Sequence, residues 1–267
     1  MIRRQGMYDL LVIGGGVAGL SAAAYVARFG HHVALIEARG IHGGLIASIG
    51  RVDGVLPSYR GNGQAYTADL MQDCTAAGVE MLEGEVIGVA SDAVLKIATG
   101  DGESYRARSV IVASGGTLRR LGVPGETELA GRGVSQCATC DGGFFRSADV
   151  IVVGGGNAAA QEALILADVC RAVTVVSRGP LRANQSYVQQ LSSRPNVKFI
   201  WNAEVEAICG TDQVEAVRLR DIRTGSKQEL GCAGVFPFIG IEPNAPFLDA
   251  SLKSDSGHVR TSDTLET

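Results

Sequence analysis

Short apolar runs alternate with helix-like stretches along the chain, and the same alternation occurs twice. The first copy has an apolar run at 9–13, a helical stretch at 20–29 and a second apolar run at 32–36. The second copy repeats this order at 150–153, 160–170 and 172–176. Uninterrupted apolar runs of this length are typical of strands buried on both faces of a parallel sheet. The pattern therefore predicts two strand–helix–strand units and an α/β fold.

A glycine-rich turn joins the first strand to the helix of the first copy. Gly14, Gly16 and Gly19 have the spacing GxGxxG, and Glu37 ends the next strand. The first glycine allows a tight turn, the second lets a pyrophosphate approach the backbone, and the third lets the helix pack on the strand. The helix N-terminus adds N–H donors for the phosphate. An ordinary turn with incidental glycines is the alternative, but the strand, helix and terminal acid in register favour a dinucleotide site.

The second copy differs from the first at the end of its second strand. Its turn contains Gly154 and Gly156, with Ala159 at the third position, and the strand ends in Ser177 and Arg178, with Arg182 nearby. An acid at this place repels a 2′-phosphate, whereas arginine binds one. The first site is therefore predicted to take a nucleotide with free ribose hydroxyls, such as FAD, and the second to take NADPH. A solvated surface pair is the alternative for the two arginines.

A CxxC motif lies between the two turns. Cys137 and Cys140 can close and reopen a disulfide, which stores two electrons, and Asp141 can supply or take the proton that thiol chemistry requires. Half a zinc site or two ordinary cysteines are the alternatives. Zinc needs four ligands, usually from two such pairs, and the other cysteines are scattered. The sequence therefore favours an electron path from a nicotinamide through a flavin to this disulfide, and on to an external disulfide.

The remaining elements are assigned from the same kinds of pattern. A helix is predicted at 65–77 and polar crossings at 118–131 and 243–246, and the CxxC motif is expected in a loop-like region. The segment 109–113 is predicted as a separate strand whose small-residue end, Ser114-Gly115-Gly116, approaches the first nucleotide. The other predicted strands are 79–82, 86–89, 94–99, 104–107, 195–201, 204–209, 214–221, 228–232 and 235–239.

Composition excludes several function classes. Hydrophobic residues make up 46% and charged residues 19%, which is ordinary for a soluble protein. The net charge is -4 and there is no basic stripe, which argues against a nucleic-acid partner. No long apolar segment follows the basic N-terminus, so neither a signal peptide nor a membrane span is expected. Six cysteines without a secretory signal fit a reducing cytosol, and a cytoplasmic location is predicted.

The segment Cys137-Ala138-Thr139-Cys140-Asp141-Gly142, followed by the turn at Gly154, resembles the low-molecular-weight thioredoxin reductases. The resemblance covers nearly the whole chain. It implies a homodimer of two Rossmann-like, three-layer ββα domains, with an NADPH domain at 118–240 inserted into an FAD domain at 1–117 plus 241–267. It also implies that the partner is thioredoxin or a similar small dithiol protein, and that the NADPH domain rotates.

The resemblance further implies the roles of individual residues. Cys140 would lie against the flavin, Cys137 would attack the substrate disulfide, and Asp141 would exchange the proton; no metal is expected. The residues implied for FAD are Gly14, Gly16, Val17, Ala18, Gly19, Glu37, Ala38, Gly43, Gly44, Leu45, Val86, Ala113, Ser114 and Gly115. Those implied for NADPH are Gly156, Asn157, Ala158, Ser177, Arg178, Arg182, Ile239 and Gly240.

The chain departs from the family pattern at three places. Ser177-Arg178-Gly179 stands for a His-Arg-Arg clamp, so a weaker preference for NADPH is expected. Gly43-Gly44-Leu45 stands for the family's Gly-Gly-Gln flavin contact, and the segment 52–56 replaces its acid-Asn-aromatic-Pro-Gly segment. The family's C-terminal flavin segment, a strand followed by Ala-Gly-Asp and a helix, is absent, so a piece of a longer reductase is expected. Alternative functions are a dithiol oxidase or a ferredoxin-driven reductase of this fold, or a flavin-free nucleotide-binding fragment. The second glycine turn and its arginine argue against the first two.

Overall fold

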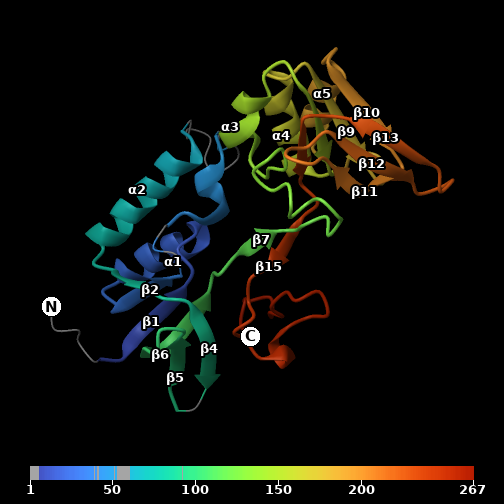
Figure 1. Cartoon of the computed structure of the whole chain (residues 1–267). Coiled ribbons are helices and arrows are strands. Elements are labelled where there is room, and N and C mark those ends of the chain that lie inside the picture. The colour runs from blue at the N-terminus through green and yellow to red at the C-terminus, as the bar shows by residue number, and fades with distance from the viewer. Residues whose placement is uncertain (1–5, 39, 41, 51, 53–60, 92) are drawn as a thin grey trace. The chain divides into compact units, whose positions relative to one another are not determined.

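The computed structural model describes residues 6–38, 40, 42–50, 52, 61–91 and 93–267 (Figure 1). The chain divides into two compact units, unit 1 comprising residues 1–117 and 243–267, and unit 2 comprising residues 118–242. The predicted inserted segment ends at 240, close to the last residue of unit 2. The chain crosses between the units through β7 (Gly116–Leu118) and β15 (Ile241–Pro243), and these two connecting strands pair with each other.

Unit 1 is built on a six-stranded sheet with the order β3-β2-β1-β6-β5-β4. Strand β1 pairs in parallel with β2 and β6, whereas β5 pairs in antiparallel fashion with β4 and β6. In chain order the elements are β1 (Tyr8–Ile13), α1 (Val17–Ala27), β2 (Val33–Glu37), the 3-10 helix η1 (Gly44–Ser48), α2 (Gly63–Ala76), β3 (Glu80–Glu83), β4 (Val86–Ser91), β5 (Leu95–Thr99), β6 (Ser104–Val112) and, after the second crossing, η3 (Ala250–Leu252).

Side chains that alternate along β1 build the two cores of unit 1. Val12 packs with Leu20 of α1 and Cys74 of α2 on the helix face of the sheet. Leu11 packs on the other face with Ile97 of the antiparallel hairpin. All five side chains are buried, and burying one Leu or Ile contributes roughly 1.5–3 kcal/mol. The apolar run therefore forms a strand because both of its faces are covered, and this fixes the turn that follows it.

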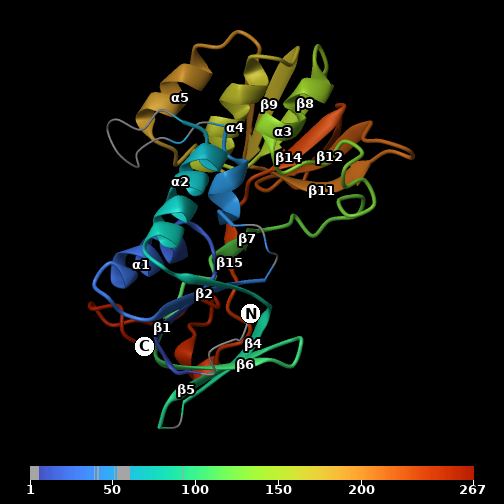
Figure 2. The ribbon, with the colours of Figure 1, turned by 90° about the vertical axis from the view of Figure 1, so that its left-hand side faces the viewer.

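Unit 2 is built on a four-stranded parallel sheet with the order β10-β9-β8-β14, and a three-stranded antiparallel sheet with the order β11-β12-β13. Figure 2 shows α5 and α4 on one side of β9 and β8, and β12 and β11 on the other. The elements are α3 (Ala138–Asp141), η2 (Gly142–Phe145), β8 (Asp149–Val153), α4 (Asn157–Ala167), β9 (Ala172–Ser177), α5 (Gln185–Ser192), β10 (Val197–Trp201), β11 (Ala203–Cys209), β12 (Ala216–Asp221), β13 (Lys227–Gly231) and β14 (Gly234–Pro237).

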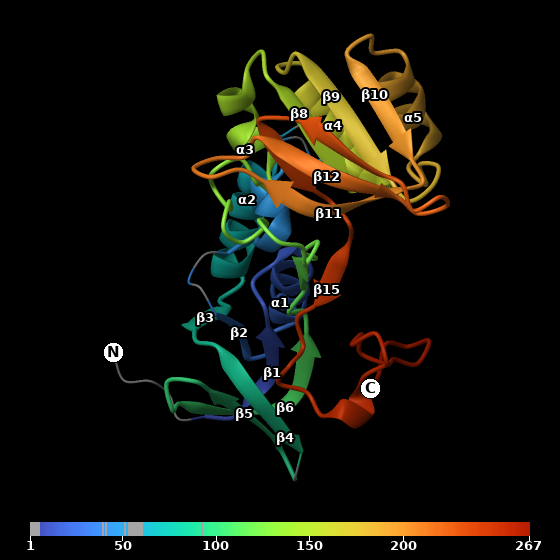
Figure 3. The same cartoon turned by 45° about the vertical axis from the view of Figure 1, so that its right-hand side comes forward.

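Unit 2 uses the same alternation along its first strand. Val152 of β8 packs with Ala163 of α4 and Leu191 of α5. Its neighbour Ile151 packs on the opposite face with Val217 of β12. Figure 3 shows β11 and β12 in front of the parallel sheet of this unit, and α5 behind it. Helices, parallel sheet and antiparallel sheet thus form three layers. The predicted α/β class with two Rossmann-like units is confirmed by this layering and by the strand–helix–strand order in both units.

Two predicted features were wrong at the level of single elements, and one helix was missed. The separate strands expected at 104–107 and 109–113 form one nine-residue strand, β6, because its first half pairs with β5 and its second half with β1. The CxxC motif is not loop-like, since it begins the short helix α3. Helix α5 was not predicted, because its polar surface hides the single fully buried side chain, Leu191, that anchors it.

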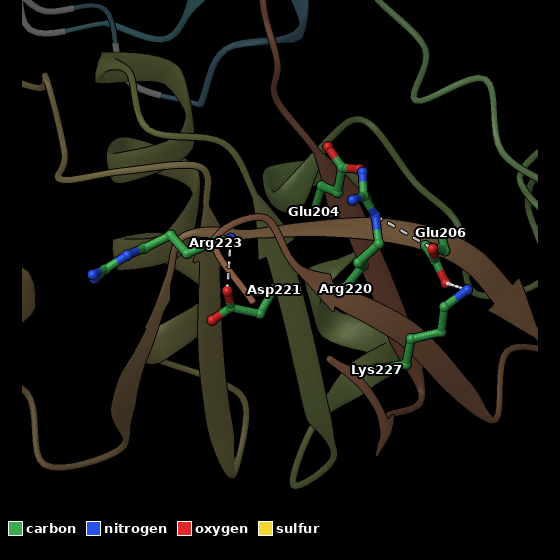
Figure 4. Close-up of polar contacts among 6 residues, drawn as sticks. All are labelled: Glu204, Glu206, Arg220, Asp221, Arg223 and Lys227. Atoms are coloured by element: carbon green, nitrogen blue, oxygen red, sulfur yellow. Dashed lines mark hydrogen bonds and ion pairs between the residues drawn. The ribbon is translucent and has the colours of Figure 1, made fainter. Parts of the chain in front are cut away.

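Ion pairs bind the three strands of the antiparallel sheet on one face (Figure 4). Arg220 of β12 pairs with Glu204 and, at 3.4 Å, with Glu206 of β11. Lys227 of β13 reaches Glu206 at 2.9 Å. Because surface pairs contribute only about 0–1 kcal/mol each, this network orders the edge of unit 2 more than it stabilises the unit.

No helix within the described residues is long and apolar enough to span a membrane.

Candidate active site

The two cysteines of the CxxC motif form a disulfide at the start of α3, with a Cα–Cα distance of 5.3 Å. Cys137 is the N-cap residue of this helix, and its Sγ accepts a hydrogen bond from Cys140 N at 3.1 Å. Cys137 is half-buried and Cys140 is exposed. A sulfur at a helix N-terminus is favoured as a thiolate over a thiol. The geometry therefore favours Cys137 as the sulfur that carries negative charge after reduction.

The acid that follows the motif is held in place by a serine that precedes it. Ser135 Oγ donates a hydrogen bond to Asp141 Oδ2 at 2.6 Å and accepts one from Cys137 N at 3.1 Å. Hydrogen bonds that involve an ionised group are shorter and stronger than neutral ones. Ser135 therefore fixes the carboxylate of Asp141 beside the disulfide, where it can exchange a proton with a sulfur.

A second carboxylate contacts the motif from α4. Glu162 Oε2 accepts a hydrogen bond from Ala138 N, the residue after Cys137, at 2.7 Å. Burial raises the pKa of Glu162, while the Ala138 N–H lowers it in part. The redox turn, by which we mean residues 137–141, is thus attached to the helix that begins at the second glycine turn.

Aromatic residues after the motif anchor it to the sheet. Phe145 packs edge-on against the buried Phe236 of β14, with ring centroids 5.2 Å apart. Gly234 lies so close to the Phe145 ring that a Cβ there would meet it at 2.6 Å, so only glycine fits. The neighbouring Phe144 is 85% exposed. The redox turn therefore sits on a rigid base and presents one large apolar side chain to the outside.

The first glycine turn has the backbone form that a nucleotide requires. Gly14 has a φ of 106°, and a Cβ there would collide with the backbone oxygen of Ala113, the residue that follows β6. A Cβ on Gly16, the N-cap of α1, would meet nothing within 4 Å, and no side chain caps this helix. The open space and the uncapped N–H groups fit a pyrophosphate. The turn therefore fits a dinucleotide such as FAD.

Two side chains complete the surroundings of the first turn. Glu37 Oε2, at the end of β2, accepts a hydrogen bond from Gly15 N at 2.8 Å. Gly43 N donates a hydrogen bond to Gly15 O at 2.7 Å, so the pair Gly43-Gly44 lies against the first glycine turn. Nearby, the buried Nε2 of His42 has no hydrogen-bond partner among the described residues. An orphaned buried nitrogen beside the turn fits a ligand with polar atoms; sequence reasoning missed it.

The structure brings several of the residues expected around FAD to this turn. Val17, Ala18 and Gly19 form the first turn of α1, and Gly44 lies against Gly16. Val86 begins β4, and its side chain packs in the same core as Ile13, the residue before Gly14. The other expected residues are Ala38 after β2, Leu45 in η1, and Ser114 and Gly115 after β6. Of the expected altered segment at 52–56, residues 53–56 lie outside the described residues. The contacts of all these residues with a cofactor stay predictions.

The second glycine turn repeats the form of the first. Gly154 has a φ of 145°, and a Cβ there would collide with Phe238 O. A Cβ on Gly156, the N-cap of α4, would meet nothing within 4 Å, and no side chain caps the helix. Asn157 Oδ1 accepts from Asn184 N at 2.7 Å, which holds the loop after β9 against the turn. This turn also fits a pyrophosphate.

Two arginines border the second turn. Arg182 N donates to Gly155 O at 2.7 Å, which places this residue at the turn. Arg178 follows Ser177, the buried last residue of β9. Both arginine side chains are exposed, and neither has an ion pair with a described residue. Two exposed cations that form no ion pair in the described part of the chain suit a 2′-phosphate. The remaining expected residues are Ala158 in α4 and Ile239 and Gly240 after β14.

The other cysteines are set apart from this chemistry. Cys74, Cys170, Cys209 and Cys232 are free. Burial raises the pKa of Cys170 to about 11 and, as the largest cause, that of Cys232 to about 12. Burial also raises the pKa of Cys74. These three thiols stay protonated near neutral pH and are poor nucleophiles. Among the described residues no cluster of three or more His, Cys, Asp or Glu could hold a metal ion.

A disulfide at a helix N-terminus, in a unit with a phosphate-binding turn, defines a nucleotide-linked disulphide oxidoreductase. Residues 8–267 match the family model of the pyridine nucleotide-disulphide oxidoreductases, and the chain belongs to this family. It is 39% identical over 264 residues to a thioredoxin reductase of Treponema pallidum, which covers 97% of this chain and 85% of that protein. It is 36% identical to a thioredoxin reductase of Bacillus subtilis, covering 98% of this chain and 83% of that protein.

Solved structures lead to the same group. A crystal structure of Lactococcus lactis thioredoxin reductase superimposes with a TM-score of 0.91 at 34% identity, covering 96% of this chain and 85% of that one. A thioredoxin reductase of T. acidophilum gives a TM-score of 0.89 at 31% identity, covering 97% and 86%. The predicted resemblance to thioredoxin reductases is confirmed, and the chain is an oxidoreductase. Thioredoxin reductases of this family use FAD and NADPH.

Proposed function

We propose that this protein passes electrons from NADPH through FAD to the disulfide of thioredoxin or a thioredoxin-like protein. The observation that carries the proposal is the Cys137–Cys140 disulfide at the start of α3, in the same unit as a glycine turn bordered by two exposed arginines. The dithiol is the group that exchanges with a protein disulfide, and the arginines are the groups that select a 2′-phosphate.

We assign the two cofactors to the two units. Unit 1 holds FAD at the turn from Gly14 to Gly19, beside Glu37 and the 43–45 loop. Unit 2 holds NADPH at the turn from Gly154 to Ala159, with the phosphate clamp at 177–182. When bound, the two cofactors supply hydride transfer and its relay to a disulfide as two electrons. The hydrogen bond from Gly15 to the carboxylate of Glu37, and the absence of an acid at Ser177, support this order.

The chain's own residues perform the exchange with the substrate. In the reduced protein the Cys137 thiolate attacks a sulfur of the substrate disulfide, forms a mixed disulfide and releases one substrate sulfur as a thiolate. The Cys140 thiol then loses its proton and attacks the Cys137 sulfur, which releases the second substrate sulfur and restores the Cys137–Cys140 bond. Asp141 exchanges the protons, because Ser135 holds its carboxylate at the motif. Two electrons leave the protein in each cycle.

An oxidase or a ferredoxin-driven reductase of the same fold would not need the second nucleotide turn. The open space at Gly156 and the free side chains of Arg178 and Arg182 favour the NADPH-dependent reductase. We further propose a cytoplasmic location, because four free thiols fit a reducing compartment. A homodimer is proposed from the resemblance, and light scattering of the purified chain tests it.

The visible absorption spectrum of the purified chain tests the proposed function, followed by anaerobic addition of NADPH. We expect a flavin band that bleaches, since this requires both cofactor sites and their coupling. A flavin band that ignores NADPH would favour the oxidase or ferredoxin-driven alternatives. A chain without any flavin band would contradict the FAD assignment and leave the nucleotide-binding alternative.

A further inference from the structure

Glu162 is a carboxylate at the redox turn that the exchange described above does not use. It lies in the middle of α4, five residues after Asn157, and accepts a hydrogen bond from the backbone of the CxxC motif. It is half-buried, and no cation among the described residues influences its charge. Its hydrogen bond to Ala138 N is its one described contact with the motif.

The start of α3 divides its N–H donors between a sulfur and this carboxylate. Cys140 N donates to Cys137 Sγ, whereas Ala138 N donates to Glu162. The other acid on the same turn, Asp141, is held by Ser135. Free N–H groups at a helix start stabilise a thiolate, and a nearby negative charge destabilises one. Glu162 disfavours the Cys137 thiolate in two ways. It occupies the Ala138 N–H, and it adds a negative charge near the sulfur.

We propose that Glu162 is a positioning residue that sets the reducing power of the Cys137–Cys140 pair chiefly through its negative charge, which lies at the start of α3 beside the Cys137 thiolate. The inference rests on the proposed function, in which this pair donates electrons. Reduction of the disulfide breaks the S–S bond and takes up two electrons and two protons, or one proton when one sulfur stays a thiolate. A redox pair whose thiolate is stabilised is a better oxidant. By disfavouring the thiolate, Glu162 makes the reduced pair a stronger electron donor.

Glu162→Gln separates charge from hydrogen bonding. The amide oxygen keeps an acceptor for Ala138 N at nearly the same volume, while the negative charge is lost. Asp168→Asn is the matched control, because it removes a carboxylate from the end of the same helix that pairs with Arg194 at 2.8 Å and does not contact the motif. Glu162→Ala is a second variant that also removes the acceptor. All variants are prepared as the full flavin-loaded chain.

The proteins are equilibrated with mixtures of reduced and oxidised dithiothreitol at about pH 9, where thiols ionise. Dithiothreitol supplies the two electrons and two protons and becomes a cyclic disulfide. The thiols are then trapped with iodoacetamide, and mass spectrometry of the peptide that contains Cys137 and Cys140 gives the reduced fraction. The rate at which Cys137 is alkylated is also measured against pH. Cys170 and Cys232 do not interfere, because burial keeps their thiols protonated in this range.

In Glu162→Gln and Glu162→Ala the dithiol–disulfide equilibrium should shift up to about tenfold toward the dithiol, which is about 30 mV, and the alkylation midpoint should fall by about one pH unit. Asp168→Asn should behave as wild type. Equal equilibria in wild type and Glu162→Gln, or a shift in the opposite direction, would overturn the inference and leave Glu162 a merely structural hydrogen-bond acceptor. A wild-type pair that does not interconvert at all would overturn the proposed function as well.

Discussion

Gly19→Ala tests the packing of the first nucleotide-binding helix, because two physical effects predict opposite signs. Gly19 lies in the first turn of α1 and is fully enclosed. Replacing a helical glycine with alanine stabilises a helix by about 1 kcal/mol when the new methyl group fits. Here the methyl group would collide with Gly14 O, and would also meet Val12 Cγ1 at 3.3 Å. Backbone cannot rotate away from such a contact as a flexible side chain can.

The collision should outweigh the gain in helix propensity. Overpacking of a close-packed interior costs about 1–3 kcal/mol, and a backbone oxygen as the obstacle places this case at the upper end. The net loss is about 1–2 kcal/mol, which corresponds to a fall in the apparent melting temperature of about 5 °C in a domain of this size. Relief of the collision also moves the Gly14 turn away from its place against Ala113, so the flavin content should fall.

Circular dichroism melting and the ratio of flavin to protein absorbance measure the two effects. Gly88→Ala is the matched control, since a Cβ there meets nothing within 4 Å and its φ is ordinary. In unit 2 the equivalent position is already alanine, and Ala159 is fully buried, so Ala159→Gly should destabilise the protein instead. A Gly19→Ala protein that melts at or above the wild-type temperature with its full flavin would refute the reasoning.

Three further predictions address the proposed chemistry. Arg178→Ala should raise the Michaelis constant for NADPH about tenfold or more, through loss of charge-assisted phosphate bonds, and leave that for NADH nearly unchanged in initial-rate assays; equal effects would remove Arg178 from the clamp. Cys140→Ser should keep the flavin band but abolish reduction of a protein disulfide, and full activity would contradict the assigned route. Ser135→Ala should lower turnover with the protein disulfide about tenfold by releasing the carboxylate of Asp141, while anaerobic bleaching by NADPH stays fast; a slowed bleaching step would show that Ser135 acts elsewhere.

The strands and glycine turns could be predicted because their signals are local. Each of the strands β1, β2, β8 and β9 contains one apolar run, and the residues of the turn that follows it stand directly beside it in the sequence. Strand β6 was predicted as two strands, because its polar residues at 108–109 suggest a break. The two halves form one strand because they pair with different partners. A strand that changes partners can be recognised only when both neighbours are placed.

The contacts that arrange the redox turn could not be read from the sequence. Ala138 and Glu162 are 24 residues apart, and their hydrogen bond exists only because β8 and α4 fold back against α3. His42 Nε2 likewise becomes an orphaned atom only after the glycine turn is folded beside it. The contact of Ser135 is a local one, since a hydroxyl two residues before a capping cysteine can accept a hydrogen bond from the N–H of that cysteine. Serines in loops are too common, however, for their position alone to predict such a contact.

The two units have the same glycine turn with residues of different charge beside it, and this difference supports the different cofactors that we propose for them. At the end of the second strand, Glu37 accepts a hydrogen bond from Gly15 N in unit 1. In unit 2 the equivalent Ser177 Oγ lies 2.8 Å from the position that a Cβ on Gly155 would take, so it lies against the same middle glycine of the turn. Serine occupies this place without a negative charge, and the exposed Arg178 that follows is free to meet a 2′-phosphate. A glutamate there would give the turn the same neighbour but repel the phosphate.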